Sequence, residues 1–504
     1  MSVRKTENYE TVTEKESTSR LTHHFRTFSQ KFIDGISNRI KEENWGEIGL
    51  DVIIIFMLVS IALFVRVLLA YELRDNFGYG SGFNVWNYSL PFGINNIDFR
   101  GFADFGYYYH SWITAWYTDS WYPYRWIEPA NVLDFYSYPP VFLYFLVLTW
   151  RPGMSNFWMA FPMVFTDAAC AGVVYLILKN IIKNKHARGI AIFGGLLMAL
   201  APINIIYDGV YWLNPGPVTF ITIIAFYFAV KKKWWQAFFW LAIATMTKQN
   251  ALFFTYPLFM VMLGEKVRNK SVREAIVESI MNAALFVGVI LLLSVPWIFI
   301  SPYQYGRHML FPGRPIELRF DPVSPASNDC VSFAKSLEQM GLGGPLLAFA
   351  SFGNYSMLWM ILSASVIAVF MFWRSYNSKL DGVEFFEWIA AYTIFTHIFM
   401  PRGVYKFYTA YYVPMILIAL LGALTNFTSN KKYLPIGMLT ASVLFFGFNI
   451  WLLVMSRWTV PFYLFMVAIT IGFIGMIRAY IREQLNNRFS QVKVQRFFDR
   501  KIGA

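Results

Sequence analysis

The sequence LDVIIIFMLVSIALFVRVLLAY, residues 50–71, decides the class of fold. A transmembrane helix needs about 20 mostly apolar residues, and this run has that length. Similar apolar runs recur along nearly the whole chain of 504 residues, of which 57% are hydrophobic and 14% charged. Soluble domains carry about 25% charged residues. The composition therefore predicts one all-α, polytopic membrane domain rather than several soluble domains.

The lysines and arginines predict the orientation of the chain in the membrane, because basic residues concentrate in cytoplasmic segments. Eight of them precede the first apolar run, so we expect residues 1–49 to form a cytoplasmic tail. Acidic residues dominate the stretch that follows this run, which predicts a large outside loop over residues 72–156. The apolar segment Tyr138–Trp150 is too short to span and is interpreted as an interfacial helix of this loop.

The same rule predicts about twelve spans between residues 50 and 477, a second outside loop at 301–352 and a basic cytoplasmic tail at 478–504. The expected spans are Leu50–Tyr71, Phe157–Leu178, Ile190–Ile206, Pro217–Val230, Trp234–Thr247, Ala251–Leu263, Ile276–Ile300, Asn354–Trp373, Phe385–Met400, Tyr408–Thr425, Pro435–Met455 and Val460–Ile477.

The net charge of +13 lies largely in loops and tails beside apolar runs, where it sets topology and meets anionic lipid. We therefore expect membrane lipids as partners and no nucleic acid. The two cysteines, Cys170 and Cys330, have no metal-ligand spacing and predict no metal site. The chain has no Walker A motif, which argues against an ATP-driven pump acting on its own.

Polar residues from distant parts of the chain are expected to share the outer surface of the membrane. They are Asp98, Asp104, His110, Asp208, Asn214, Lys248, Gln249, Arg402 and Lys406. Polar groups near hydrocarbon are costly and usually face a cavity or a partner. A cavity with carboxylates and cations suits a charged lipid head group and chemistry on a hydroxyl. Asp167, in the middle of a predicted span, is expected either to pair with a buried cation or to line this cavity.

Each of these residues also has a structural interpretation. Asp104 could be a solvated loop acid, and Lys248 could extend its ammonium to water from a helix end. Arg402 and Lys406 could be interface anchors, and His110 could be structural. The position of Lys248 between two short apolar runs favours a functional site.

Two adjoining stretches of the first outside loop resemble a known family. DFGYYYHSWITAWYTDSWYPY, which begins at Asp104, and FYSYPPVFLYFL, which begins at Phe135, resemble the polyprenyl-phosphate-sugar glycosyltransferases of the GT-C superfamily, most of all the α-mannosyltransferase branch. The residues in the family's order are Asp104, Pro123, Tyr124, Tyr138, Pro139, Pro140, Asp167, Lys248, Pro257, Lys406, Tyr408 and Pro414. The chain departs from the family between Tyr207 and Pro217, where many relatives carry Gly-Gln-x-Asp.

The resemblance implies a GT-C fold and an enzyme that moves a hexose, mannose in that branch, from a polyprenyl or dolichyl phosphate donor to a hydroxyl of a glycan or lipid acceptor. Transfer would invert the anomeric centre on the outer or lumenal face of a cell or endoplasmic reticulum membrane. Asp104 is the implied general base, with Asp98 second. Lys248, Arg402 and Lys406 would bind the donor phosphate. The implied cavity residues are His110, Asp167, Asp208, Asn214, Gln249 and Tyr408. The scheme requires no cofactor and leaves a divalent metal open.

The alternative function is a secondary transporter or a lipid-linked sugar flippase. Transporters usually have matched halves with broken helices at the midplane, whereas the long acidic loop of this chain has no counterpart. A noncatalytic membrane scaffold is a third interpretation. The sugar, the acceptor, the carrier length and the oligomeric state stay open from the sequence.

Overall fold

The computed structural model describes residues 45–73, 105–118, 122–124, 136, 138–183, 185–310, 330–331, 356–378, 380–398, 404–427 and 434–454. The chain divides into two compact units, residues 1–56 and residues 57–504. In the first unit the structure describes residues 45–56, which form the start of the helix Trp45–Leu73. All contacts below lie within the second unit.

The described residues are helical almost throughout. The α-helices are α2 (Trp45–Leu73), α3 (Ser111–Thr118), α4 (Pro140–Thr149), α5 (Asn156–Ile181), α6 (Ala187–Ala199), α7 (Pro202–Asn204), α8 (Pro215–Val230), α9 (Trp234–Thr247), α10 (Thr255–Asn269), α11 (Val272–Ile300), α12 (Pro302–Leu310), α15 (Ser356–Asn377), α16 (Gly382–Ile398), α17 (Val413–Phe427) and α18 (Leu434–Val454). Two π-helices, η1 (Phe105–His110) and η3 (Ile205–Val210), and two 3₁₀ helices, η4 (Gln249–Phe254) and η6 (Lys406–Tyr411), interrupt them.

Four of these helical stretches are long and apolar enough to cross a membrane, judged by length and composition over the described residues: Gly46–Leu73, Asn156–Ile181, Ala187–Val210 and Val272–Ile300. Each overlaps one of the predicted spans. The described parts of the other predicted runs are helical apart from a turn at Tyr412, and Val460–Ile477 lies outside the described residues. The helical class of the chain is thus confirmed for its described part. The predicted interfacial segment forms the ten-residue helix α4, which starts with a proline at its first turn.

Three predicted spans are interrupted, one of them being Tyr408–Thr425, which begins in the 3₁₀ helix η6 and passes a turn at Tyr412 before α17. The run Ile190–Ile206 is broken where α6 ends at Ala199, because Pro202 has no N–H to continue the helical ladder. The run Ala251–Leu263 starts inside the 3₁₀ helix η4 before α10 begins. A two-residue antiparallel pairing of β1 (Cys330–Val331) with β2 (Val404–Tyr405) adds a short strand contact to the predicted all-α fold.

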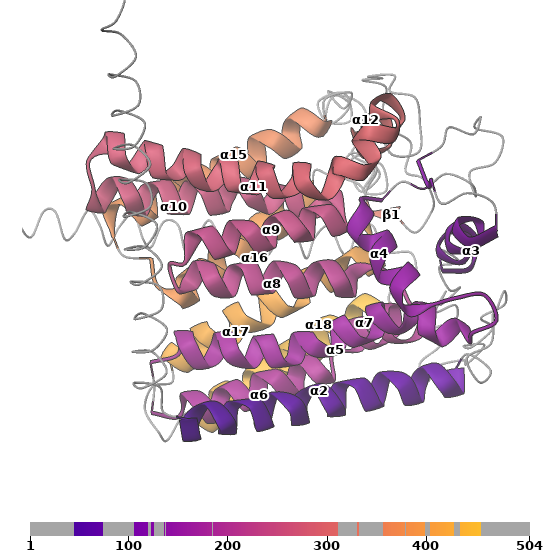
Figure 1. The fold of residues 1–504 in the computed structure, drawn as a ribbon. Helices are drawn as coiled ribbons and strands as arrows, with labels where there is room; N and C mark the ends of the chain where they lie inside the picture. Colours follow the sequence, from indigo (N-terminus) through magenta and orange to yellow (C-terminus); the bar gives the residue numbers. More distant parts are fainter. Residues whose placement is uncertain are drawn as a thin grey trace, which may run out of the picture. The chain divides into compact units, whose positions relative to one another are not determined.

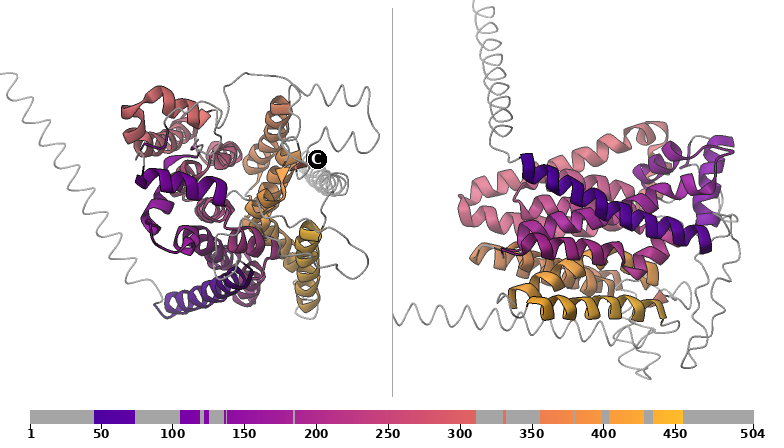
Figure 2. Two further views of the ribbon diagram at one scale, coloured as in Figure 1. Left: turned by 90° about the vertical axis from the view of Figure 1, so that its right-hand side faces the viewer. Right: turned by 90° about the horizontal axis from the view of Figure 1, so that it is seen from below.

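The helices of the second unit pack side by side (Figure 1). Helix α5 contacts both α6 and α8, α8 contacts α9, and α9 contacts α11. Helix α10 packs on α15. Helices α17 and α18, orange and yellow in both views of Figure 2, lie next to each other, and α17 also contacts α5 and α6.

Small residues allow the closest of these helix contacts. A Cβ added at Gly194 of α6 would lie 2.2 Å from Leu178 Cδ1 of α5, and one added at Gly195 would lie 3.1 Å from the Ala171 carbonyl oxygen. Small residues let helix backbones approach closely, which is the usual basis of helix packing within membranes. This explains the sequence TDAACAG in the middle of α5.

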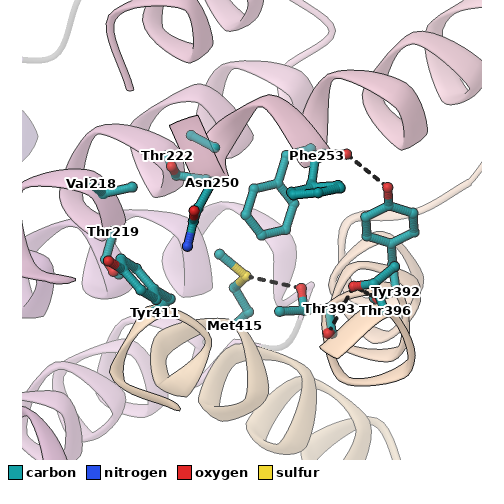
Figure 3. Close-up of a pocket in the computed structure, with 12 residues that line it drawn as sticks. Val218, Thr219, Thr222, Asn250, Phe253, Tyr392, Thr393, Thr396, Tyr411 and Met415 are labelled. Atoms are coloured by element: carbon teal, nitrogen blue, oxygen red, sulfur yellow. Dashed lines mark hydrogen bonds between the residues drawn. The ribbon is translucent and has the colours of Figure 1, made fainter. Parts of the chain in front are cut away.

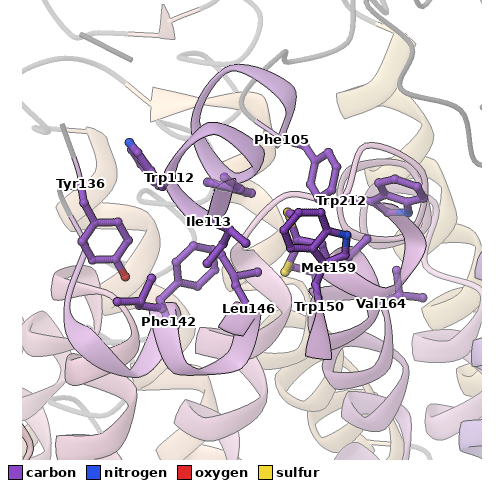
Figure 4. Close-up of a cluster of buried hydrophobic side chains, with 14 of the residues drawn as sticks. Phe105, Trp112, Ile113, Tyr136, Phe142, Leu146, Trp150, Met159, Val164 and Trp212 are labelled. Atoms are coloured by element: carbon purple, nitrogen blue, oxygen red, sulfur yellow. The ribbon is translucent and has the colours of Figure 1, made fainter. Parts of the chain in front are cut away.

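The segment between α2 and α5 contributes an aromatic cluster around η1, α3 and α4 (Figure 4). Phe105 of η1 packs edge-on against Trp212, with ring centroids 4.9 Å apart. Tyr109 packs in the same way against Phe142 of α4, at 5.1 Å. Aromatic pairs of this geometry contribute about 0.5–1.5 kcal/mol each beyond their buried area. The cluster therefore fixes η1 against the stretch that precedes α8.

Candidate functional site

A single side-chain amide joins four distant segments of the chain. The Nδ2 group of Asn214 donates hydrogen bonds to the hydroxyls of Tyr109, at 2.6 Å, and Tyr138, at 2.7 Å. Its Oδ1 accepts from Lys248 Nζ at 2.8 Å and from the Tyr411 hydroxyl at 2.9 Å. A primary amide has two N–H donors and two acceptor lone pairs. These four bonds use all of them, which fixes the orientation of a side chain that is 1% exposed.

Lys248 is a buried ammonium surrounded by aromatic rings. Its Nζ lies 5.0 Å from the ring centroid of Tyr408, 5.2 Å from Tyr411, 5.4 Å from Tyr138 and 5.8 Å from Phe407. The residue is 6% exposed. Aromatic faces attract a cation within about 6 Å of their centre, and more strongly where water is excluded. We call Lys248, Asn214 and the rings of Tyr138, Phe407, Tyr408 and Tyr411 the Lys248 cage.

The local backbone explains why Lys248 lies inside the protein. Helix α9 ends at Thr247, and Lys248 has the extended conformation φ −155°, ψ 135° before η4 begins. A cation beyond the last turn of a helix is stabilised by the partial negative charge of its carbonyl end. Asn214 is the residue directly before α8, and Tyr408 and Tyr411 belong to η6. Lys248, Asn214 and the rings of η6 thus all lie at an interruption or an end of a helix, and Tyr138 lies two residues before α4.

The structure brings three of the predicted site residues together: Asn214, Lys248 and Tyr408. It adds Tyr109 and Tyr411, which the sequence analysis did not single out. Both occur in tyrosine-rich stretches next to predicted residues, YYYH and KFYTAYY. Such clusters were the available signal, but nothing local distinguishes the tyrosine that points toward Asn214 from its neighbours.

Asp167 and Asp208 lie in a second buried cluster. Arg66 Nε of α2 donates to Asp167 Oδ2 of α5 at 2.5 Å. Asn204 Nδ2 donates to Asp167 Oδ1 at 2.8 Å and is 3.4 Å from Asp208 Oδ2. All four residues are 0% exposed. Asp167 therefore pairs with a buried cation, which is one of the two alternatives predicted for it, and the cation is Arg66.

His110 ends η1 and is half-buried beside Trp150, with ring centroids 5.6 Å apart. Its Nδ1 is 3.5 Å from the Thr114 hydroxyl. Burial lowers the pKa of His110 from its usual value of 6.5, because a charged imidazolium loses hydration. Gln249 directly follows Lys248 and opens η4.

The structure does not describe the side chains of the remaining predicted site residues. Asp98, Asp104 and Arg402 lie outside the described residues, and Lys406 is described only as the first residue of η6. In the chain, Asp104 directly precedes Phe105, whose ring packs on Trp212. Among the described residues, no group of three or more His, Cys, Asp or Glu side chains could hold a metal ion.

A narrow pocket, with a cavity volume of about 30 Å³, lies between α8, η4, α16 and α17 (Figure 3). Its lining is mainly apolar and aromatic, with Phe253, Phe254 and Met415 among the lining residues. Tyr411 also lines it, and the hydroxyl of the same residue donates to Asn214. The pocket and the Lys248 cage therefore share one wall.

This arrangement can bind a molecule that carries a negative charge at one end and an apolar body. The ammonium supplies the charge, the tyrosine hydroxyls supply hydrogen bonds, and the pocket supplies apolar surface.

Neither a scan against protein-family models nor a comparison with curated proteins finds a match to this chain.

Proposed function

We propose that the protein is a membrane glycosyltransferase of the GT-C type, which moves a hexose from a polyprenyl or dolichyl phosphate to a hydroxyl acceptor, with mannose as the first sugar to test. The observation that carries the proposal is the Lys248 cage beside an apolar pocket. A sugar-phosphate lipid combines the same two features, an anionic head group and a long apolar chain.

The donor phosphate binds at Lys248 in this scheme. A phosphate in a partly dry site needs compensating charge and hydrogen bonds. Asn214 already joins the ammonium to the hydroxyls of three tyrosines, and those of Tyr109 and Tyr138 keep their own O–H to donate. Arg402 and Lys406 are proposed as further phosphate ligands, since Lys406 begins η6 next to Phe407 and Arg402 lies four residues earlier in the chain. The first isoprene unit then lies against the apolar side chains that line the pocket beside Tyr411.

The acceptor hydroxyl attacks the anomeric carbon from the face opposite the phosphate, so the anomeric centre is inverted. A carboxylate takes the hydroxyl proton. We assign this role to Asp104, with Asp98 second. The packing of Phe105 on Trp212, two residues before Asn214, supports a base close to the cage. The leaving phosphate needs cationic stabilisation and no general acid.

The proposal includes twelve spans with both tails in the cytoplasm and the site on the outer or lumenal face.

A second function, a secondary transporter or lipid-linked sugar flippase, is favoured by one specific feature. Helices α9 and α10 are separated by the extended Lys248 and by η4, and discontinuous helices of this kind form binding sites in transporters.

The two functions are separated by incubating the protein, purified in nanodiscs, with radiolabelled polyprenyl-phosphate-mannose and a panel of hydroxyl acceptors. Transfer to an acceptor, or slow hydrolysis in its absence, supports the glycosyltransferase, and both are expected to be lost in Lys248→Ala. Lys231→Ala is the matched control, because Lys231 is an exposed lysine that contacts Tyr227 at the other end of α8. In proteoliposomes, movement of the intact lipid between leaflets without sugar release would replace the proposal by the flippase.

A further inference from the structure

A buried ion pair lies behind the segment that carries Asn214. Arg66 and Asp167 are both 0% exposed and are joined at 2.5 Å. The Nη1 group of Arg66 also donates to the carbonyl oxygens of Ala62, at 3.0 Å, and Ala199, at 2.8 Å. These bonds tie the guanidinium to α2, α5 and the end of α6. Its position is therefore set by three helices.

Residues 204–216 contact this ion pair at several points. Asn204 donates to Asp167 at the start of the segment, at 2.8 Å. A Cβ added at Gly209 would lie 2.8 Å from Arg66 Cγ, and a Cβ added at Gly216 would lie 3.0 Å from Asp167 Cβ. The segment touches the ion pair before Asn214 and again after it. Glycine is required at 209 by Arg66, and at 216 by the Met163 carbonyl oxygen of α5, which would lie 2.6 Å from an added Cβ.

The backbone of this segment has little regular structure of its own to hold Asn214. It passes from the π-helix Ile205–Val210 to Trp212, which has a positive φ of 60°. A non-glycine residue in that conformation persists only where its surroundings hold it. The nearby backbone hydrogen bond from Leu213 N to Tyr207 O, at 2.9 Å, closes a turn and not a helix. The ion pair and the Phe105 ring that packs on Trp212 therefore together hold the backbone that carries Asn214.

We propose that the Arg66–Asp167 pair is a positioning element for the Lys248 cage. By fixing residues 204–216, the pair aims the amide of Asn214 at Lys248 and at the tyrosine hydroxyls. Arg66 and Asp167 touch no substrate in this scheme and act through Asn214. The role of the pair in donor binding rests on the proposed function. Its role in holding Lys248 away from solvent does not, and can be measured without a donor.

The test is the double variant Arg66→Met with Asp167→Leu in the full-length protein. Replacing both members of a buried ion pair by apolar residues of similar size is often neutral for stability. Here it also removes the partners of Asn204 and of two buried carbonyl oxygens, so the melting temperature falls and labelling is measured at a temperature where the variant is folded. Lys248, measured by reductive methylation and mass spectrometry, becomes accessible and reacts at least about tenfold faster. The donor KM rises by about tenfold or more, because misplacing a positioned group by about 1 Å costs up to about 10²-fold.

The matched control is Arg374→Met with Glu384→Leu, which removes another nearly buried ion pair, between α15 and α16. It leaves Lys248 protected and the donor KM unchanged. The exposed Lys231 serves as the internal standard for labelling. Unchanged Lys248 protection in a folded Arg66/Asp167 double variant would overturn the proposal.

If the double variant fails to fold, Asn204→Leu is measured instead. It keeps the ion pair and removes the 2.8 Å hydrogen bond that ties the segment to Asp167, together with a longer contact of 3.4 Å to Ala410 O of η6. Faster methylation of Lys248 in Asn204→Leu supports the positioning role, and unchanged protection refutes it. If the wild type transfers no sugar, the proposed function fails, and the methylation result still decides between the two outcomes for the ion pair.

Discussion

Replacing Asn214 by leucine, which has nearly the same size and no polar atom, tests how much the Lys248 cage contributes to the fold. The change removes three hydrogen bonds to tyrosine hydroxyls and one to an ammonium. A neutral bond contributes about 1 kcal/mol and a bond to a charged group about 2 kcal/mol, which gives about 5 kcal/mol in total. Burying the leucine side chain returns about 2 kcal/mol. The expected loss in the free energy of unfolding is about 3 kcal/mol.

Asn449→Leu is the matched control, because Asn449 is equally buried and makes two neutral hydrogen bonds, to Phe445 O and from Ile203 N. The same arithmetic gives a loss near zero: about 2 kcal/mol of hydrogen bonding against about 2 kcal/mol of burial. Reversible denaturation of both variants in detergent measures the two values. A loss for Asn214→Leu no larger than that for Asn449→Leu would refute the view that Asn214 organises the cage.

Asn214→Asp separates stability from ligand binding at the same position. A carboxylate still accepts from Lys248 and Tyr411, and the hydroxyls of Tyr109 and Tyr138 can turn to donate to it. The fold is therefore retained. An anion facing the donor phosphate costs several kcal/mol, so donor affinity falls. Normal donor binding by Asn214→Asp would show that the donor phosphate does not bind at Lys248.

Three further predictions concern topology, chemistry and pH. Cysteines introduced at Ser81 and Ser324 react with an impermeant reagent from the side opposite both tails, and tail labelling without permeabilisation would reject this topology. Asp104→Asn lowers the transfer rate by on the order of 10²–10⁴ without loss of folding; near-normal turnover moves the general base to Asp98. Because the folded pKa of His110 is lowered from 6.5, the unfolded chain binds the proton more readily. The contribution of His110 to stability is therefore present above about 6.5 and is lost as pH falls below it. Thermal unfolding as a function of pH measures this, and His110→Gln should flatten the dependence.

Within the described residues, the sequence by itself determined the helical class and the approximate positions of the apolar helices. Hydrophobic runs, prolines and basic clusters act locally, so the start of α4 at its proline pair and the extent of α5 could be predicted from nearby residues. Pro202 was also a local signal for the break after α6, although the predicted span Ile190–Ile206 included this proline without a break. Lys248 stood out because a lysine between two short apolar runs is costly wherever it lies.

Only the tertiary structure decided which of these residues meet. Tyr411 and Asn214 are 197 residues apart, and Arg66 and Asp167 are 101 apart. No periodicity within a helix relates such positions, so the sequence left the partner of Asp167 open and did not single out Arg66. Cation–π contacts and side-chain hydrogen bonds act over only a few ångströms. They form where folding places helix ends together, and the packing of η1, η6 and the 204–216 segment around the end of α9 is what turns separate polar residues into one site.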